Sequence, residues 1–307
     1  MKKYLMILTF SFCYMQGDIS GYTIFDYSNS SGNDGFDIKR AYFSYSSDIS
    51  EDLFFKIRFD VGRHDSDDRL TTYLKNAYVD WKCENGDKLS MGLIGTNSYG
   101  VQENNWGYRF IEKSVLDKYG MTNTADFGVG YSKLFGKIDI NVQLLNGEGF
   151  KSEEEMGEQA MYLRVLYGES KLNKNDGMNF GIIINYIPYH SLADDLDHTL
   201  TGFFGGWASN NLRLGLEYNQ FDTFNNNDGD EFTEEASSVY ANYSINDEWD
   251  IFVRHDVNDE NIDDNTDADA YSWVGAVWNP TKGLYISPNV HVVDNTNTYH
   301  LTCMFKY

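Results

Sequence analysis

The chain ends in a segment, Tyr299 to Tyr307, in which apolar and polar side chains alternate without a break. Successive side chains of an extended backbone point to opposite faces, so a period of two predicts a β-strand with one apolar and one polar face. The apolar face of this strand would carry Tyr299, Leu301, Cys303, Phe305 and Tyr307. The segment therefore needs neighbouring strands and two different environments, one on each side of the sheet.

The same alternation recurs along the whole chain. It is clear in Leu53–Val61, Ala77–Trp81, Leu89–Leu93, Phe127–Tyr131, Ile138–Leu144, Met161–Tyr167, Met178–Ile184, Leu212–Tyr218, Val239–Tyr243, Trp249–Val253 and Leu284–Val292. It is weaker in Tyr22–Tyr27, Phe36–Tyr45, Thr199–Trp207 and Tyr271–Trp278. These segments predict about sixteen strands, within the range of single-chain outer-membrane barrels. An amphipathic final strand that ends on an aromatic residue resembles the closing strand of such a barrel.

The connections between the segments alternate between short and long. The short ones are Ser47–Asp52, Cys83–Asp87, Leu134–Lys137, Gly168–Gly177, Ala208–Asn211, Ile245–Glu248 and Asn279–Gly283. The long ones are Gly62–Leu70, Gly95–Thr124, Asn146–Glu158, Ile187–Asp197, Phe221–Glu235 and Val257–Ala270. This parity favours a 16-stranded antiparallel transmembrane β-barrel with short periplasmic turns and long extracellular loops. A soluble β-sandwich has no reason to sort its loops in this way.

The composition agrees with an all-β chain and excludes some partners. With 3 Pro but 27 Gly and 23 Tyr, it favours strands and turns over helices. A mean hydropathy of −0.50 excludes a bundle of membrane helices, but not a barrel whose strands alternate lipid-facing and lumen-facing residues. A net charge of −23 argues against nucleic acid, which requires clustered Lys and Arg.

The N-terminus resembles a secretory signal peptide. Lys2 and Lys3 precede a short apolar run from Tyr4 to Met15, which is too short to cross a bilayer. We therefore expect residues 1–17 to be removed, with Gly21 as an alternative cleavage point, and residues 18–307 to form the barrel in the outer membrane of a Gram-negative type of cell. The two remaining cysteines predict no disulfide framework.

Charged residues occur on the polar faces of the expected strands, where a water-filled lumen would solvate them. Pore-lining candidates from the strands are Lys56, Arg58, Asp60, Arg164, Arg213 and Arg254. Pairs such as Arg58 with Asp60 could also be neutralised wall charges. The third long connection, about 95–124, contains a segment expected to be helical from Arg109 to Lys118, with Arg109 and Lys113 one turn apart. Loops of this length are usually functional.

The segments Phe36–Phe43 and Leu74–Trp81 resemble the N-terminal half of the phosphate-selective porin O and P family, over roughly residues 36–150. The resemblance implies a 16-stranded channel whose third loop folds inward and narrows the pore with basic residues. By position, Arg109 and Lys113 correspond to that constriction. Because this chain is strongly acidic and has few lysines, phosphate selectivity does not follow.

Enzymatic and metal motifs are weak in this sequence. There is no HExxH or GxSxG pattern, and His190, Ser191 and Asp194 are neighbours of a kind that arises by chance. The acidic stretches 225–231 and 256–269 do not fit the EF-hand register. We therefore expect no enzyme activity, no cofactor and no metal, and interpret the acidic stretches as solvated loops.

We conclude that the sequence predicts a passive diffusion porin for small hydrophilic or ionic solutes. Two alternatives are an outer-membrane hydrolase on a barrel scaffold and a surface adhesion or structural barrel with a plugged lumen. Expected partners are outer-membrane lipid and lipopolysaccharide, small solutes or ions, and further copies of the chain in a homotrimer. Ion selectivity stays open, because acidic loops attract cations while basic residues inside favour anions.

Overall fold

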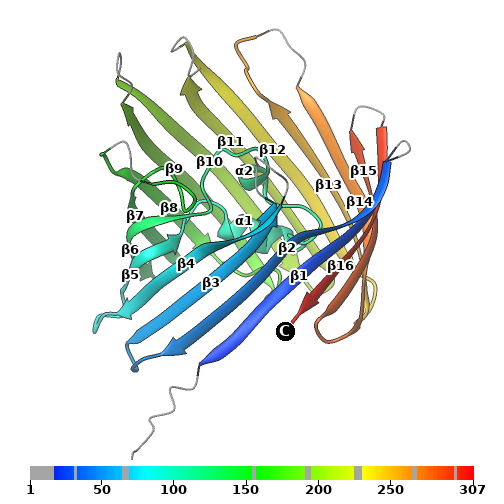
Figure 1. Ribbon diagram of the computed structural model, residues 1–307, viewed down its shortest axis with the longest axis horizontal. Coiled ribbons are helices and arrows are strands. Elements are labelled where there is room, and N and C mark those ends of the chain that lie inside the picture. Colours follow the sequence, from blue (N-terminus) through cyan, green and yellow to red (C-terminus); the bar gives the residue numbers. More distant parts are fainter. Residues whose placement is uncertain are drawn as a thin grey trace, which may run out of the picture.

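The chain forms a closed barrel of sixteen antiparallel strands in which β1 pairs with β16 (Figure 1). The structure, a computed structural model, describes residues 17–30, 33–63, 69–153, 157–190, 195–224, 230–264, 268–293 and 296–307. The predicted fold class is confirmed. The expected signal peptide lies outside the described residues except for Gly17. In the described part of the chain, no helix is long and apolar enough to cross a membrane.

Every segment expected from the alternation lies within a strand, except that Tyr307 follows the end of the last one. The strands are β1 (Asp18–Ser30), β2 (Asn33–Asp48), β3 (Leu53–Arg63), β4 (Leu70–Lys82), β5 (Lys88–Gly95), β6 (Ala125–Phe135), β7 (Ile138–Leu145), β8 (Ala160–Gly168), β9 (Gly177–His190), β10 (Asp195–Ser209), β11 (Leu212–Phe224), β12 (Glu231–Ser244), β13 (Trp249–Asp259), β14 (Asp269–Thr281), β15 (Leu284–Val293) and β16 (Thr296–Lys306). The beginning of β1 and the C-terminus lie at the same rim (Figure 1), as an even number of strands requires.

The two faces of the sheet differ as the period predicts. Apolar side chains on the outside stay exposed, for example Met91 at 45% and Phe203 at 51%. Many polar side chains on the inside are buried, for example Asn185 at 0% exposed. Exposed apolar side chains around a whole barrel suit a lipid surround, because burying apolar area in hydrocarbon is favourable and the closed ladder leaves no unpaired strand edge.

Some of the long connections are shorter than the alternation suggests. Strands β9 and β10 continue to pair as far as His190 and Asp195, where the sequence predicted a loop from Ile187 to Asp197. Pro188 within β9 and the acidic residues Asp195 and Asp197 in β10 suggest a loop in the sequence, although the ladder of paired residues continues. The sequence therefore predicts the short turns at one rim more accurately than it predicts where the strands end at the other rim.

The face assignment can be tested with two consecutive residues of β5. Met91 points outward, whereas the Ser90 hydroxyl donates a hydrogen bond of 2.5 Å to Asp80 Oδ1 inside the barrel. Met91→Lys should destabilise the folded barrel by roughly 2–4 kcal/mol, because it places a charge in hydrocarbon. Ser90→Lys should cost much less, since its amine would lie in water beside a carboxylate. Folding titrations into lipid vesicles measure both, and equal costs would mean that the faces are assigned wrongly.

Candidate functional site

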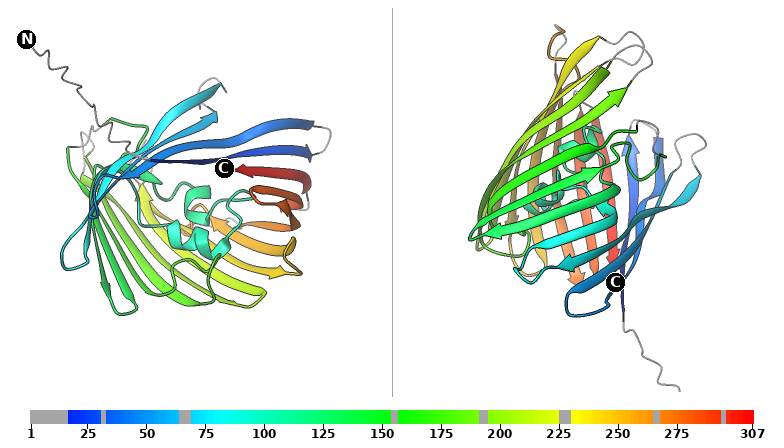
Figure 2. Two further views of the ribbon diagram at one scale, coloured as in Figure 1. Left: turned by 90° about the horizontal axis from the view of Figure 1, so that it is seen from below. Right: turned by 90° about the vertical axis from the view of Figure 1, so that its left-hand side faces the viewer.

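The long connection between β5 and β6, residues 96–124, lies inside the barrel (Figure 2). We call it the inward loop. It contains two short helices, α1 (Gly100–Trp106) and α2 (Val115–Lys118). Helix α1 contacts β10 and β11, and α2 contacts β12. Aromatic residues of the loop also pack with Ile24 of β1 and Trp273 of β14, so its contacts extend around much of the inner wall.

The predicted helix from Arg109 to Lys118 is wrong. Helix α1 ends at Trp106 because Gly107 adopts a left-handed φ of 79° and its N–H donates to the Glu103 carbonyl. The next helix begins only at Val115. Arg109 and Lys113 still come together, but through a shared carboxylate. Arg109 Nη2 lies 2.9 Å from Asp117 Oδ2, and Lys113 Nζ lies 3.3 Å from Asp117 Oδ1.

Apolar side chains hold the inward loop against the wall. Trp106 is fully buried, with its ring centroid 5.4 Å from Tyr240 and 5.7 Å from Phe252. Val115 and Leu116 of α2 join a buried cluster with wall residues that include Leu166, Ile183, Leu200 and Phe204. Isoleucine and leucine side chains would be unfavourable on a wall that faces a water-filled lumen. Their presence on β8, β9 and β10 marks the part of the wall that the loop covers.

Polar contacts fix the position of the loop. Asn105 and Asn179 exchange two side-chain hydrogen bonds of 2.8 Å each. The Trp106 carbonyl accepts hydrogen bonds from Asn242 at 2.7 Å and from Arg213 at 3.1 Å. These bonds satisfy carbonyl and amide groups that would otherwise be buried without partners.

The end of α2 is held by a charged and aromatic contact. Lys118 Nζ lies 3.6 Å from Asp256 and close to the rings of Tyr271 and Trp273, at 3.9 and 4.1 Å from their centroids. Burial lowers the pKa of Lys118 to about 8, against the opposing effect of the Asp256 carboxylate. Arg254, which is 0% exposed, also pairs with Asp256 and donates to the Lys113 carbonyl at 2.5 Å.

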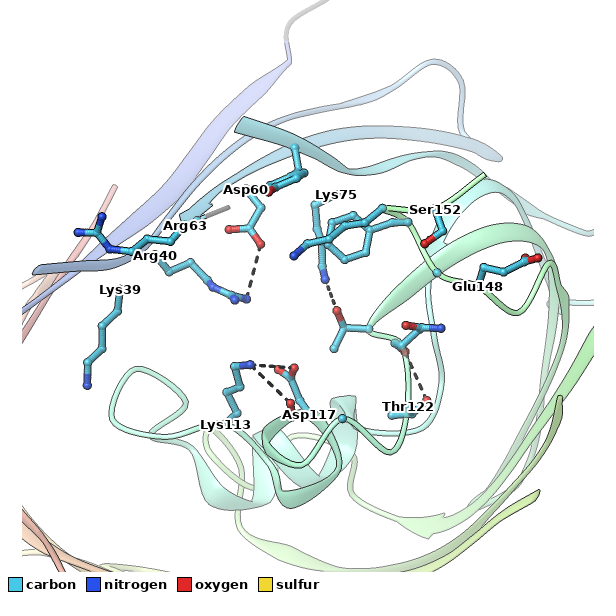
Figure 3. A pocket seen from close by; sticks show the side chains of 18 residues that line it. Lys39, Arg40, Asp60, Arg63, Lys75, Lys113, Asp117, Thr122, Glu148 and Ser152 are labelled. Carbon is cyan, nitrogen blue, oxygen red and sulfur yellow. Dashed lines mark hydrogen bonds and ion pairs between the residues drawn. The ribbon is translucent and has the colours of Figure 1, made fainter. Parts of the chain in front are cut away.

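Part of the lumen stays open. Between the inward loop, strands β2, β3 and β4 and the connection from β7 to β8 lies a cavity of about 490 Å³, which we call the outer cavity (Figure 3). Its basic lining residues are Lys39, Arg40, Arg63, Lys75, Lys113 and Lys151. Its acidic lining residues are Asp60, Asp117 and Glu148. In a chain with a net charge of −23, this lining has the opposite sign to the molecule as a whole.

A smaller cavity of about 210 Å³, the inner cavity, continues the basic lining. Lys56, Arg58 and Arg109 line it, together with Lys75, which borders both cavities. Glu103 is the acidic residue of this lining, and it pairs with Arg109. The two cavities thus form a region of basic character beside the inward loop.

Two β-bulges add basic residues to this region. Ile24 pairs with Arg40 and Phe25 with Ile38, so Lys39 has no partner in β1. Arg58 pairs with Asn76 and Phe59 with Leu74, which leaves Lys75 without a partner in β3. An extra residue in one strand lets two consecutive side chains face the same side. The pairs Lys39–Arg40 and Lys75–Asn76 both face the lumen in this way.

The candidates from the sequence fall into two groups. Lys56, Arg58, Asp60, Arg109 and Lys113 line the outer or inner cavity, and Arg164 pairs with Asp139 at 3.0 Å in a third cavity. Arg213 and Arg254 instead bind backbone carbonyls of the inward loop, so they hold the loop in place.

Sequence reasoning missed Lys39, Arg40 and Lys75. The signal that could have found them is a pair of polar residues between two outward apolar ones, as in Ile38-Lys39-Arg40-Ala41 and Leu74-Lys75-Asn76-Ala77. Strict alternation cannot place two consecutive polar residues on one face, so such a pair within a strand indicates a bulge.

The enzymatic and metal motifs weighed in the sequence can be compared with the part of the chain that the structure describes. Within the described residues, no group of three or more His, Cys, Asp or Glu side chains is arranged to hold a metal ion. The neighbours His190, Ser191 and Asp194 cannot be assessed as a catalytic set, because Ser191, Asp194 and the side chain of His190 lie outside the described residues.

The Asn105–Asn179 contact provides a test of the loop position. Asn105→Ala or Asn179→Ala alone should cost roughly 1–3 kcal/mol, because each leaves a buried amide without its partner. The double variant should cost less than the sum of the single ones, since both remove the same contact. Urea titrations of the folded barrel give the three values. Strictly additive costs would mean that the two amides do not touch.

Comparisons with known proteins agree with the barrel fold. The family model described as phosphate-selective porin O and P matches residues 13–132, which confirms the resemblance in the N-terminal part. No curated protein matches the chain.

Solved structures share the fold at low sequence identity. The outer membrane channel DcaP of Acinetobacter baumannii is 13% identical, with a TM-score of 0.69 over 95% of this chain and 97% of that one. The anion-selective porin from Comamonas acidovorans is 9% identical, with a TM-score of 0.69 over 95% and 99%. The trimer form of OmpT, an outer membrane protein of Vibrio cholerae, is 13% identical, with a TM-score of 0.66 over 95% and 99%. The chain is thus similar to outer-membrane porins over nearly its whole length.

Proposed function

We propose that this protein is a passive diffusion channel of the bacterial outer membrane that admits small hydrophilic solutes and favours anions. The observation that carries the proposal is the basic lining beside the inward loop. Lys39, Arg40 and Lys75 from the wall and Lys113 from the loop all line the outer cavity (Figure 3). A solute that crosses the barrel on this side would pass between them.

The positions of the charged residues affect the ion preference of a channel more than its total net charge does. Carboxylates on the outer loops act through bulk water, where a Debye length of about 8 Å screens them at physiological salt. Charges on a narrow passage with low-dielectric walls are screened less and focus their field on the passing ion. The acidic surface therefore does not require a cation channel, provided that the narrowest part is basic.

The arrangement also suits passage and not only binding. Conduction needs sites that attract a solute weakly and in succession, so that it can leave again. Lys39 and Lys113, with side chains 38% and 36% exposed, border the outer cavity, and Lys56 and Arg58 border the inner cavity. A series of partly neutralised basic groups meets that requirement. Asp60 and Asp117 keep any one position from holding an anion too strongly.

The proposal includes a location in the outer membrane and assembly into a homotrimer. The exposed apolar outer surface and the resemblance of the N-terminus to a signal peptide support export to the outer membrane. One similar structure is a trimer form, which supports a homotrimer. We propose lipopolysaccharide and outer-membrane lipid as the surround.

Two other functions remain to be separated from a channel by experiment. A structural or adhesion barrel would have a closed lumen, and a hydrolase would need a catalytic set at a rim. Reconstitution of the protein into planar bilayers distinguishes them. Stepwise conductance is expected for a channel. A correctly folded barrel that never conducts would exclude the channel function.

Two lysines give the sharpest test of anion preference. Replacing both Lys39 and Lys113 by Gln removes two positive charges from opposite sides of the outer cavity and leaves Asp26 and Asp117 with fewer partners. The reversal potential in a salt gradient should shift toward cations. Asp263→Asn with Asp264→Asn alters the same amount of charge on an exposed outer segment and should change the reversal potential little. A larger response to the aspartates than to the lysines would place selection at the mouth and contradict the proposal.

A further inference from the structure

The outer ends of β12 and β13 form a cavity separate from the basic region. It has a volume of about 400 Å³ and is lined by Tyr119, Phe232, Glu234, Asn258, Glu260 and Asn261. Tyr119 directly follows α2, which lies beside the outer part of β12 (Figure 1). The cavity therefore joins three elements, namely the two strand ends and the inward loop.

The strand register brings two carboxylates together here. Ala236 pairs with Asn258 and Glu235 with Asp259, so the next position places Glu234 opposite Glu260. The backbone N–H of Ile262 donates to the Thr233 carbonyl at 3.0 Å and keeps the segment after β13 close to β12. Like charges on directly opposed residues are unfavourable. Among the residues that line this cavity, none is a lysine or arginine.

A third oxygen in the same place lacks a partner. Asn258 is only 5% exposed and lies on the same inward face of β13 as Arg254 and Asp256. Among the described residues, its side-chain Oδ1 has no hydrogen-bond partner. A buried amide oxygen without a partner is costly, and native structures normally satisfy it with a protein group, water or an ion.

We infer that Glu234, Glu260 and Asn258 form a binding site for a divalent cation, with Ca²⁺ as the ion that fits best. Two carboxylates and a neutral amide oxygen are hard ligands of the kind that Ca²⁺ takes from proteins. The open cavity leaves space for Asn261 and water to complete a shell of six to eight oxygens. Mg²⁺ fits less well, since it demands a small octahedral shell and loses water reluctantly.

The ion would neutralise the two carboxylates and link the segment 260–264 to β12 beside the end of the inward loop. The site is independent of which solute passes through the barrel. Because the extracellular side is rich in calcium compared with the cell interior, a weak site is sufficient. A dissociation constant on the order of 10⁻⁴–10⁻³ M is usual for extracellular calcium modules.

Terbium luminescence provides the first measurement. Tb³⁺ is a luminescent substitute for Ca²⁺, and Tyr119 lies in the cavity to sensitise its emission. The folded full-length protein in detergent should show Tb³⁺ emission that Ca²⁺ displaces, with Mg²⁺ displacing it only at a much higher concentration. Glu234→Gln with Glu260→Gln should abolish this emission. Absence of emission that Ca²⁺ can displace from the unaltered protein would overturn the proposal.

A matched control uses the other face of β12. Glu231→Gln with Glu235→Gln removes the same amount of charge, in this case entirely from β12, and Glu235 accepts a hydrogen bond from Tyr218 on the outer surface. This pair should leave the displaceable emission intact. An equal loss in both double variants would show that net charge alone attracts the ion and would reject a defined site.

Substitutions at Asn258 distinguish a defined binding site from a group of acidic residues that attracts cations only by its charge. Asn258→Asp adds a third carboxylate, so it should tighten Ca²⁺ binding on the order of tenfold and make the melting temperature more dependent on Ca²⁺ than in the unaltered protein. Asn258→Leu should weaken binding while preserving the barrel, as judged by circular dichroism. If neither change at Asn258 alters Ca²⁺ binding, the proposal fails even when the carboxylates matter.

Discussion

The structure depends on one constraint, which is that every backbone N–H and C=O at membrane depth must find a partner within the protein. The pairing of β1 with β16 meets this constraint because it turns a sheet with two open edges into a closed ladder. Closure then divides each strand into an outer and an inner face. Residues such as Met91 and Phe203 face outward, and the inner face carries the polar groups on which any transport function must rest.

The inner face is itself divided in two. Strands β8 to β14, together with β1, offer apolar and amide side chains that hold the inward loop, among them Ile183, Leu200 and Asn179. Strands β2 to β4 offer lysines and arginines instead. The loop is thus bound to these strands and leaves the basic side open. Its own Arg109 and Lys113 face that open side, where Asp117 holds both of them. This division leaves the basic side chains around the cavities that the inward loop does not fill.

The periodicity of the sequence was sufficient to predict the strand number, the faces and the place of the long third connection, because each depends on local alternation. The helix from Arg109 to Lys118 could not be predicted correctly, since Gly107 ends α1 early and tertiary contacts select the remaining turns. Arg213 and Arg254 looked like pore residues because a strand pattern shows which face a side chain is on, but not what covers that face. Lys39 and Lys75 were missed because a bulge breaks the alternation on which the prediction rested.

The central claim is that solutes pass between the inward loop and the basic wall, and a cysteine at Lys113 tests it most directly. In a background with Cys83 and Cys303 changed to Ser, Lys113→Cys should react with a charged methanethiosulfonate reagent, and the current through single channels should fall in steps. A cysteine at Asp263, on the exposed outer segment, should react without reducing the current. If Lys113→Cys is modified and the current does not change, solutes take another route and the account is wrong.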